Sequence, residues 1–365
     1  MKKSVSKRYH FVRWEDGSTI VKLSFEDIEE THGAPYYLVH RADLHAALLQ
    51  AVEKAGVQVS NHKRVVSYDF EAPSATTQDG ETLTADLIIG ADGIKSITRP
   101  LLTGQPDVPR DTGDVAYRIL IPASKLLAAG DPELAALITD PCTTSWCGPG
   151  AHLVGYPIRD GELYNVVVCA TAAHNETTDA VWVVRGDNSE LRRRFAAWEP
   201  RVRRLCGLTG DFMKWRLCDL GGARALSRWA HPAGKVVLLG DSCHPMLPYL
   251  AQGAAQAFED AAALRQVLAQ NLDENNDKDK NLDLRGALAR YERARMPRAS
   301  LVQAKTREHQ YILHIPDGAE QRDRDERLRL NAPENPIFWG YDERRKWLFS
   351  HDAEVLDAED ARGTG

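Results

Sequence analysis

The clearest pattern of apolar and polar residues lies between Gly234 and Leu264. Val236 to Leu239 is an apolar run that is too short for a helix and ends at a glycine, which predicts a strand of a parallel sheet. Asp241 follows just past the carboxyl end of that strand, where open α/β sheets place their ligands. A proline-rich loop then leads to Gly253 and Ala254, which begin a predicted helix without bulky side chains, so backbone N–H groups there can approach a phosphate.

Two further segments carry polar residues where a predicted element begins or ends. Leu87 to Ile89 is another short apolar strand, and Asp92 with Gly93 would then turn the chain tightly before a helix start near Ser96. Arg41 stands at the start of a predicted helix whose apolar residues recur at helical spacing. Taken alone, Arg41 is better interpreted as a solvated residue at a helix start.

The middle of the chain has the pattern of an antiparallel sheet. Val115 to Ile121 predicts a first strand. Leu153 to Ile158 and Leu163 to Ala170 predict two more, which pair around a turn at residues 159–161. Downstream of the sheet, helices are predicted at Leu284–Arg295 and Gln303–Leu313, with a bend between them at Pro297.

Composition limits the class of protein. With 365 residues and 43% hydrophobic residues, the chain exceeds one average domain and can form real cores, so two domains are expected. The net charge is −6 with both signs dispersed, which excludes the basic surface of a nucleic-acid-binding protein. No apolar run reaches the length of a membrane span, and the N-terminus lacks the apolar region of a signal peptide. We therefore expect a cytoplasmic protein with no membrane or nucleic-acid partner.

The cysteines do not suggest a metal site. None of the six forms a C-x-x-C pair or has zinc-like spacing with histidine. We expect reduced residues of the core in a cytosolic protein, with a bond between Cys142 and Cys147 as the minority alternative.

Three motifs in chain order resemble those of single-component, FAD-dependent aromatic hydroxylases of the salicylate-hydroxylase-like, fungal type. The family's second FAD-binding motif reads G-D-(A/S)-x-H-x-x-x-P, then Q-G, then E-D-A. The chain matches it at Gly240, Asp241, Ser242, His244, Pro245, Pro248, Gln252, Gly253, Glu259, Asp260 and Ala261. The segment Ala85–Arg99 resembles the family's D-G motif, and Tyr37–Leu49 resembles its arginine-bearing helix. The alternative for the segment Gly240–Ala261 is an ordinary strand, turn and helix with a capping aspartate.

The resemblance covers Trp14 to about Asp342 and implies the fold. It is an α/β (α+β) fold: an incomplete Rossmann-like FAD-binding domain with an inserted antiparallel substrate domain and a C-terminal helical tail. The implied domains are residues 1–105 for the first FAD-binding part, 106–223 for the substrate domain, 224–305 for the second FAD-binding part and 306–365 for the tail.

The family's first motif, G-x-G-x-x-G, does not occur in this sequence. We therefore expect that about 70 residues of the family's usual N-terminal segment are missing. Either the gene model is incomplete or the protein is a natural truncation. This leaves an alternative function open, in which the chain is a non-catalytic remnant that binds FAD poorly.

The resemblance implies a reaction and a cofactor. Members of the family reduce FAD with NAD(P)H, trap O₂ as a C4a-hydroperoxide and pass one oxygen atom to a small aromatic substrate, here in a degradative or secondary-metabolic setting. Asp241 would bind the ribityl chain, and Arg41 would reach the flavin side chain and pyrophosphate. Gly253 and Ala254 would present N–H groups to the pyrimidine carbonyl, and Asp92 would belong to the D-G motif beside FAD.

Substrate residues are expected on the predicted sheet. Arg118 and Tyr156 lie on strands that should face the same region, and the resemblance to related phenol dearomatases implies that this pair anchors a phenolate. The alternative is that Arg118 forms a structural ion pair and Tyr156 belongs to the core. His152 is a weaker candidate base, and His244 is either a proton relay or a hydrogen-bonding residue of its loop.

Overall fold

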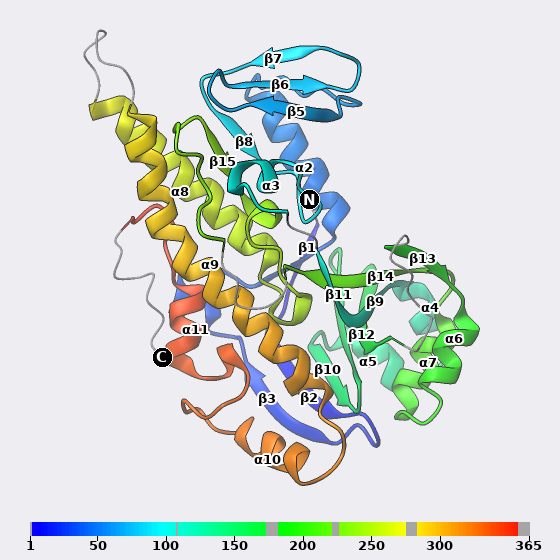
Figure 1. Cartoon of the computed structure of the whole chain (residues 1–365). Helices are drawn as coiled ribbons and strands as arrows, with labels where there is room; N and C mark the ends of the chain where they lie inside the picture. Colours follow the sequence, from blue (N-terminus) through cyan, green and yellow to red (C-terminus); the bar gives the residue numbers. More distant parts are fainter. Residues whose placement is uncertain (1, 107–108, 173–181, 221–225, 275–282, 357–365) are drawn as a thin grey trace. The chain divides into compact units, whose positions relative to one another are not determined.

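The computed structural model describes residues 2–106, 109–172, 182–220, 226–274 and 283–356 (Figure 1). The chain divides into two compact units. Unit 1 contains residues 1–59, 113–217 and 311–350, and unit 2 contains residues 60–112, 218–310 and 351–365. Each unit is described by itself below. The domain boundaries expected from the sequence, one of which falls outside the described residues at 223/224, stay a prediction.

Unit 1 is built on an eight-stranded sheet with the strand order β13-β14-β9-β12-β11-β10-β2-β3. Strands β9, β12, β11 and β10 pair antiparallel in that order, while β10 pairs parallel with β2. The three strands predicted in the middle of the chain are confirmed. The strand bounds are β2 (Arg8–Arg13), β3 (Thr19–Ser24), β9 (Arg110–Pro122), β10 (Thr143–Gly148), β11 (Ala151–Ile158), β12 (Leu163–Thr171), β13 (Val183–Gly186) and β14 (Phe212–Asp219).

Buried and exposed side chains alternate along β9, so the two faces of the sheet differ. Tyr117, Ile119 and Ile121 are buried on one face, while Arg118 and Leu120 are exposed on the other. Successive side chains of a strand point to opposite faces, so this pattern is what a sheet covered on one face requires. Across the sheet, Arg118 pairs with Val167 of β12, and Val167 pairs with Val154 of β11. Both valines are half-buried.

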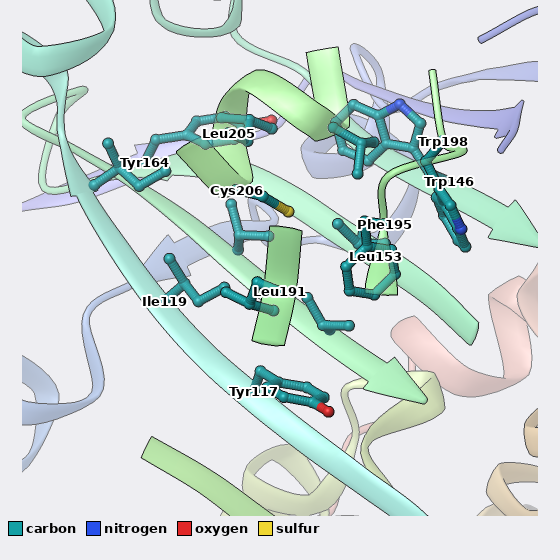
Figure 2. Close-up of a cluster of buried hydrophobic side chains, with 14 of the residues drawn as sticks. Tyr117, Ile119, Trp146, Leu153, Tyr164, Leu191, Phe195, Trp198, Leu205 and Cys206 are labelled. Atoms are coloured by element: carbon teal, nitrogen blue, oxygen red, sulfur yellow. The ribbon is translucent and has the colours of Figure 1, made fainter. Parts of the chain in front are cut away.

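Four helices and the buried face of the sheet form the main core of unit 1. Figure 2 shows Tyr117, Ile119 and Leu153 of the strands with Leu191, Phe195 and Leu205 from the helical side of the same cluster. Asp131 and Asp187 cap two of these helices, because their carboxylates accept hydrogen bonds from the first-turn N–H groups. The helices are α4 (Ala123–Ala128), α5 (Pro132–Thr139), α6 (Asn188–Arg194) and α7 (Pro200–Leu208).

The rest of unit 1 lies around strands β2 and β3. The ring of Trp339 lies 4.9 Å from that of Tyr9 and 5.8 Å from that of Phe25, so the C-terminal segment packs back onto the N-terminal strands. The remaining elements are β1 (Lys3–Val5), which pairs antiparallel with β4 (Tyr37–Val39), and α1 (Ile28–His32), α2 (Arg41–Lys54), α10 (Ala319–Arg327), η3 (Phe338–Gly340) and α11 (Asp342–Phe349).

Unit 2 contains the parallel strand pair that the apolar runs predicted. Strands β8 (Ile88–Gly90) and β15 (Val236–Leu238) run parallel and side by side, and a separate antiparallel sheet contains β5 (Val65–Asp69), β6 (Ser74–Thr77) and β7 (Thr82–Thr84) (Figure 1). The helical elements are α3 (Thr98–Thr103), η1 (Gly240–Ser242), η2 (Pro248–Leu250), α8 (Gly253–Glu274) and α9 (Leu284–His314). The last residues of α9, 311–314, belong to unit 1.

Helix α9 contains both of the helical segments predicted at Leu284–Arg295 and Gln303–Leu313. The structure has one helix of 31 residues, and Pro297, where the sequence predicted a bend, lies inside it. A proline in a helix removes one backbone hydrogen bond, at a cost of about 3 kcal/mol. Arg295 and Arg298, on either side of Pro297, are buried and hydrogen bonded, and these contacts offset that cost.

Two other expectations from the sequence can be compared with the structure. All six cysteines are unpaired, so the minority alternative of a Cys142–Cys147 bond is wrong. Among the described residues, no helix combines the length and apolar character needed to cross a membrane.

Two neighbouring leucines of α4 test the packing of the unit 1 core. Leu126 is fully buried at 0% exposure, and Leu127 is 49% exposed. We predict that Leu126→Ala lowers the free energy of unfolding by about 2–5 kcal/mol, because it leaves a cavity. Leu127→Ala should change it by less than about 1 kcal/mol. Urea denaturation followed by circular dichroism measures both, and equal losses would contradict the packing described here.

Candidate functional site

The carboxyl end of strand β15 presents Asp241. Gly240 turns the chain there with φ +65°, a conformation that favours glycine, and Asp241 follows it with an exposed side chain. Ser242 fastens the turn, because its hydroxyl donates to the Gly90 carbonyl at 2.6 Å. The turn is thereby tied to the adjacent parallel strand, and a carboxylate is exposed at the position where such sheets bind ligands.

The N-terminus of α8 lies on the same chain segment. The helix begins at Gly253, as predicted, and is 22 residues long. This end of the helix is partly open, since Gly253, which has no side chain, is half-buried and Ala254 is exposed. The first N–H groups of a helix have no partner within the helix, so this end can donate hydrogen bonds to an electronegative atom.

The buried carboxylate of Asp260 holds the turn and the loop after it. Asp260 Oδ2 accepts hydrogen bonds from the Gly240 backbone N–H at 2.9 Å and from His244 Nε2 at 2.5 Å. Arg295 Nε donates to Asp260 Oδ1 at 2.8 Å. The two halves of the motif, G-D-S-x-H and E-D-A, are therefore joined by one carboxylate, and the ring of His244 is hydrogen bonded to Asp260 of α8.

A second carboxylate extends this network. Glu259 accepts from Arg295 at 2.5 Å and from Arg298 Nε at 2.7 Å. Burial opposes ionisation of Asp260 and Glu259, but donors outweigh it and hold both pKa values below their ordinary range. For Asp260 the donors are His244 and Arg295, and for Glu259 they are the two arginines. Both groups are therefore anionic at neutral pH.

The sequence analysis missed Arg295 and Arg298. Both are fully buried and lie one helical turn apart on α9, among buried apolar residues such as Ala299 and Val302. Arginines at core-facing positions of an apolar helix stripe need buried acidic partners, and this signal could have identified them. Asp260 and Glu259 are those partners.

Asp92 makes its described contacts within its own loop. Its carboxylate accepts hydrogen bonds from the Ser96 hydroxyl at 2.6 Å, the Ile97 N–H at 2.9 Å and the Thr98 hydroxyl at 2.9 Å. Burial opposes ionisation, yet these donors lower the pKa of Asp92. Asp92 thus supports the start of α3, and direct contact with a cofactor stays a prediction.

Arg41 is the first residue of α2 in unit 1 and is exposed. The start of this helix is fixed by Asp43, whose carboxylate accepts from Arg159 Nη2 at 2.5 Å and from Arg159 Nε at 2.7 Å. These hydrogen bonds lower the pKa of Asp43. Arg159 belongs to the turn that follows β11, so the pair ties Arg41 to the strand that carries Tyr156.

Arg118, Tyr156 and Arg41 lie within electrostatic reach of one another. The Arg118 side chain is in contact with solvent, but the protein around it removes part of its hydration. This partial desolvation lowers the pKa of Arg118, and the charge of Arg41 adds to the shift. Burial raises the pKa of Tyr156, while the charges of Arg118 and Arg41 oppose it. Arg118 Cζ also lies 5.8 Å from the centroid of the Trp215 ring, in a cation–π arrangement. Two cations and a phenol hydroxyl therefore gather in unit 1.

His152 lies on the same strand as Tyr156 and is buried. Four positions separate them, so their side chains point to the same face of the sheet. His152 Nδ1 lies 2.8 Å from His314 Nε2, and His314 Nδ1 lies 3.3 Å from Asp114 Oδ2. The sequence analysis named His152 but missed His314 and Asp114, which come from distant parts of the chain.

The expected site residues therefore form two groups. Asp92, Asp241, Gly253 and Ala254 belong to unit 2, and Arg41, Arg118 and Tyr156 belong to unit 1. The groups differ in chemistry. Unit 2 exposes a carboxylate and helix N–H groups, whereas unit 1 gathers cations and a phenol on a partly open sheet face.

Comparisons with known proteins give consistent matches. A family model described as an FAD binding domain matches residues 5–306. The chain is 33% identical over 352 residues to the FAD-dependent monooxygenase OpS4 of Beauveria bassiana, with 94% of this chain and 78% of that protein covered. It is 34% identical over 348 residues to 3-amino-4-hydroxybenzoate 2-monooxygenase of Streptomyces cremeus, covering 95% and 78%. It is 32% identical over 314 residues to 3-hydroxybenzoate 6-hydroxylase 1 of Aquipseudomonas alcaligenes, covering 84% and 73%.

Solved structures share the fold. A substrate complex of salicylate hydroxylase matches with a TM-score of 0.76 and 25% identity, covering all (100%) of this chain and 85% of that one. Klebsiella pneumoniae HpxO complexed with FAD and uric acid matches with a TM-score of 0.70 and 24% identity, covering 89% and 77%.

Two arginines of α9 test the buried network. Arg295 is buried between Asp260 and Glu259, whereas Arg293 is exposed on the same helix. We predict that Arg295→Met lowers the free energy of unfolding by about 3–5 kcal/mol, because two buried carboxylates lose a shared cation. Arg293→Met should stay within about 0.5 kcal/mol of the unmodified protein. Comparable urea midpoints for the two variants would contradict the network's role.

The same variants should differ in acid. A carboxylate whose folded pKa is depressed stabilises the fold above its unfolded pKa, about 3.9 for Asp and 4.3 for Glu. That stabilisation is lost as the pH falls through the folded pKa. Without Arg295, burial raises the pKa of Asp260 and Glu259, so acid unfolding of Arg295→Met should begin at a higher pH than that of Arg293→Met. An acid titration followed by circular dichroism tests this, and coinciding curves would refute it.

Proposed function

The chain belongs to the FAD binding domain family, and from that premise we propose that it uses FAD, NAD(P)H and O₂ to hydroxylate a small aromatic substrate with a phenol or carboxylate group. The motif-based prediction of an FAD-dependent aromatic hydroxylase is confirmed at the level of the family, and the protein is a flavoprotein monooxygenase. The pyridine nucleotide, the oxygen chemistry and the cytoplasmic location belong to the proposal.

The residues of unit 2 fit FAD. The exposed carboxylate of Asp241 can accept hydrogen bonds from ribityl hydroxyls. The open N-terminus of α8 at Gly253 and Ala254 can donate to a flavin carbonyl and stabilise negative charge on the ring. An added Cβ at Gly253 would meet only Met246 Cγ, at 3.7 Å, so glycine there leaves the helix end accessible. Arg41 is proposed to reach the flavin side chain and pyrophosphate.

The cofactor would supply the redox chemistry, because bound FAD takes electrons from NAD(P)H and activates O₂. The balanced reaction converts Ar–H, O₂, NAD(P)H and a proton into Ar–OH, water and NAD(P)⁺. One oxygen atom enters the ring, and the other leaves as water with the two electrons from the nucleotide. The protein residues bind and orient the substrate, exclude water and control its protonation.

Arg118 and Tyr156 are proposed to anchor the substrate. A cation close to a bound phenol lowers its pKa, and the phenolate has the electron-rich ring that accepts an electrophilic oxygen. Arg41 already acts on both residues electrostatically. Relatives are named for 3-hydroxybenzoate and 3-amino-4-hydroxybenzoate, which carry both a phenol and a carboxylate. A hydroxybenzoate-like acid is therefore the favoured substrate class.

His152 is the proposed base for the phenol proton. It shares a face of β11 with Tyr156, and burial together with the neighbouring His314 lowers the pKa of His152 well below its ordinary value. A neutral imidazole is the form that accepts a proton. The observation that supports the whole proposal most strongly is the exposed Asp241 beside the buried Asp260 network, because it combines a family motif with a geometry that fits FAD.

The first experiment concerns the cofactor. We predict that Asp241→Ala weakens FAD binding by roughly 10- to 100-fold, because a charge-assisted contact contributes about 1.5–3 kcal/mol. Asp86→Ala is the matched control, since Asp86 is exposed in unit 2 just before the amino end of β8. Quenching of flavin fluorescence measures both. Unchanged affinity in Asp241→Ala would contradict the assignment, and no FAD binding by the unmodified chain would favour the remnant alternative.

The second experiment concerns the substrate. We predict that Arg118→Ala keeps FAD but loses substrate-stimulated flavin reduction by roughly 10- to 100-fold across hydroxybenzoates. Arg110→Ala is the control, because Arg110 is exposed at the start of the same strand. Stopped-flow reduction with NADH and NADPH measures the effect. An unchanged response to every active substrate would remove Arg118 from the substrate site.

A further inference from the structure

The face of the unit 1 sheet opposite the helical core carries a block of side chains that the pairing register defines. Paired residues of antiparallel strands, and residues two positions apart on one strand, point to the same face of a sheet. The face that carries Arg118 therefore also carries its partners on β12 and β11 and the row two positions further along. We call these two rows of three the open-face block: Arg118, Val167 and Val154, then Leu120, Asn165 and Tyr156.

Asn165 lies in the middle of the second row, between Leu120 and Tyr156. Leu120 is 46% exposed, whereas Asn165 and Tyr156 are half-buried. Residues that pair directly across antiparallel strands have Cβ atoms about 5 Å apart, and diagonal neighbours lie about 7–8 Å apart. Asn165 is therefore the direct neighbour of Tyr156 and a diagonal neighbour of Arg118, the two residues proposed to anchor the substrate.

An asparagine is unfavourable at this position of the fold. Strand β12 lies between β9 and β11 in the middle of the eight-stranded sheet, and three valines follow Asn165 in it. Asparagine is depleted in strands, and a half-buried amide loses part of its hydration. Within the part of the chain that the structure describes, the Asn165 side chain makes no hydrogen bond that would offset this loss. Such a conflict with the local fold is typical of a functional position.

The chemistry of the open-face block determines what the amide of Asn165 can bind. The guanidinium of Arg118 only donates hydrogen bonds, whereas the side chain of Asn165 also has a carbonyl that accepts them. Apolar contact with a ring is available from the other members of the block, Leu120, Val167 and Val154. A ring anchored by its phenol group would therefore place a neighbouring substituent at Asn165, and a carbonyl acceptor selects a hydroxyl or amino group there.

We propose that Asn165 is a specificity-determining residue, whose side-chain carbonyl binds a hydroxyl or amino group next to the phenol that Arg118 and Tyr156 anchor. The proposal deepens the proposed function and rests on it, because the same sheet face must bind the substrate. It narrows the substrate class to aromatic acids with two adjacent hydrogen-bonding substituents. A site built to bind such a group disfavours the analogue that lacks it, because the buried polar atom then has no partner.

The first test measures binding without turnover. Isothermal titration calorimetry of the full chain with FAD present compares 3,4-dihydroxybenzoate with 4-hydroxybenzoate, and 2,3-dihydroxybenzoate with 3-hydroxybenzoate. In at least one pair the dihydroxy compound should bind roughly 10-fold more tightly. Asn165→Leu has a similar size without polar atoms, so it should reduce this preference to about 2-fold or less and keep the affinity for the monohydroxy compound. Thr171→Val, at the exposed end of the same strand, is the control and should keep the preference.

The second test uses charge to check that Asn165 lies beside the anchoring residues. Asn165→Asp places a carboxylate diagonal to Arg118, where it competes with the anionic substrate for the guanidinium. The affinity for monohydroxy and dihydroxy compounds should therefore fall alike, by roughly 10-fold. Asn165→Leu should weaken only the binding of the dihydroxy compound. An affinity for 4-hydroxybenzoate and 3-hydroxybenzoate that is unchanged in Asn165→Asp would contradict this placement.

The stability of Asn165→Leu separates a role in recognition from a structural role. Leucine needs no hydrogen bond on a half-buried strand, so the urea midpoint of this variant should equal or exceed that of the unmodified protein. A lower midpoint, or an unchanged preference for the dihydroxy compounds, would overturn the proposal. If the unmodified protein binds hydroxybenzoates but prefers no dihydroxy compound, this proposal fails while the proposed function stands. If it binds none of them, the proposed function fails as well.

Discussion

The buried carboxylate of Asp260 is the interaction on which the rest of unit 2 depends. One oxygen fixes the backbone of Gly240 and the ring of His244, and the other binds Arg295 of α9. These contacts join the end of β15, the loop after it, α8 and α9. A single ionised group without partners at this depth would cost several kcal/mol, so the four elements are stable only together. The network thereby holds Asp241 and the N-terminus of α8 where the cofactor is proposed to bind.

In unit 1, the positions of the side chains depend on the alternation of buried and exposed residues along each strand. Tyr117 and Ile119 send their side chains into the helical core, and the residue between them, Arg118, therefore points to the other face. The same rule brings Tyr156 and His152 to one face of β11. Because the core fixes the register, a shift by one residue would bury Arg118 and expose the core. The residues proposed to bind the substrate are therefore positioned by the same packing that stabilises the sheet.

Much of the fold, and the family, could be predicted from local sequence patterns. The apolar runs predicted β8 and β15, the glycine and alanine predicted the start of α8, and the ordered motifs predicted the family. The partners of the motif residues could not be predicted in the same way. Arg295 lies 35 residues from Asp260, and His314 lies 162 residues from His152. Such pairs depend on topology, and helix propensity alone also breaks α9 at Pro297, where tertiary contacts of Arg295 and Arg298 keep it continuous.

The central claim is that the Asp260 network positions Asp241 for FAD, and a double-mutant cycle on the FAD dissociation constant tests it most directly. The cycle compares Asp241→Ala, Arg295→Met and the double variant. If the network acts through Asp241, the double variant should lose less affinity than the sum of the single losses, with a coupling energy of at least about 0.5 kcal/mol. Losses that add to within about 0.3 kcal/mol would show that the network and Asp241 act independently and would contradict the account.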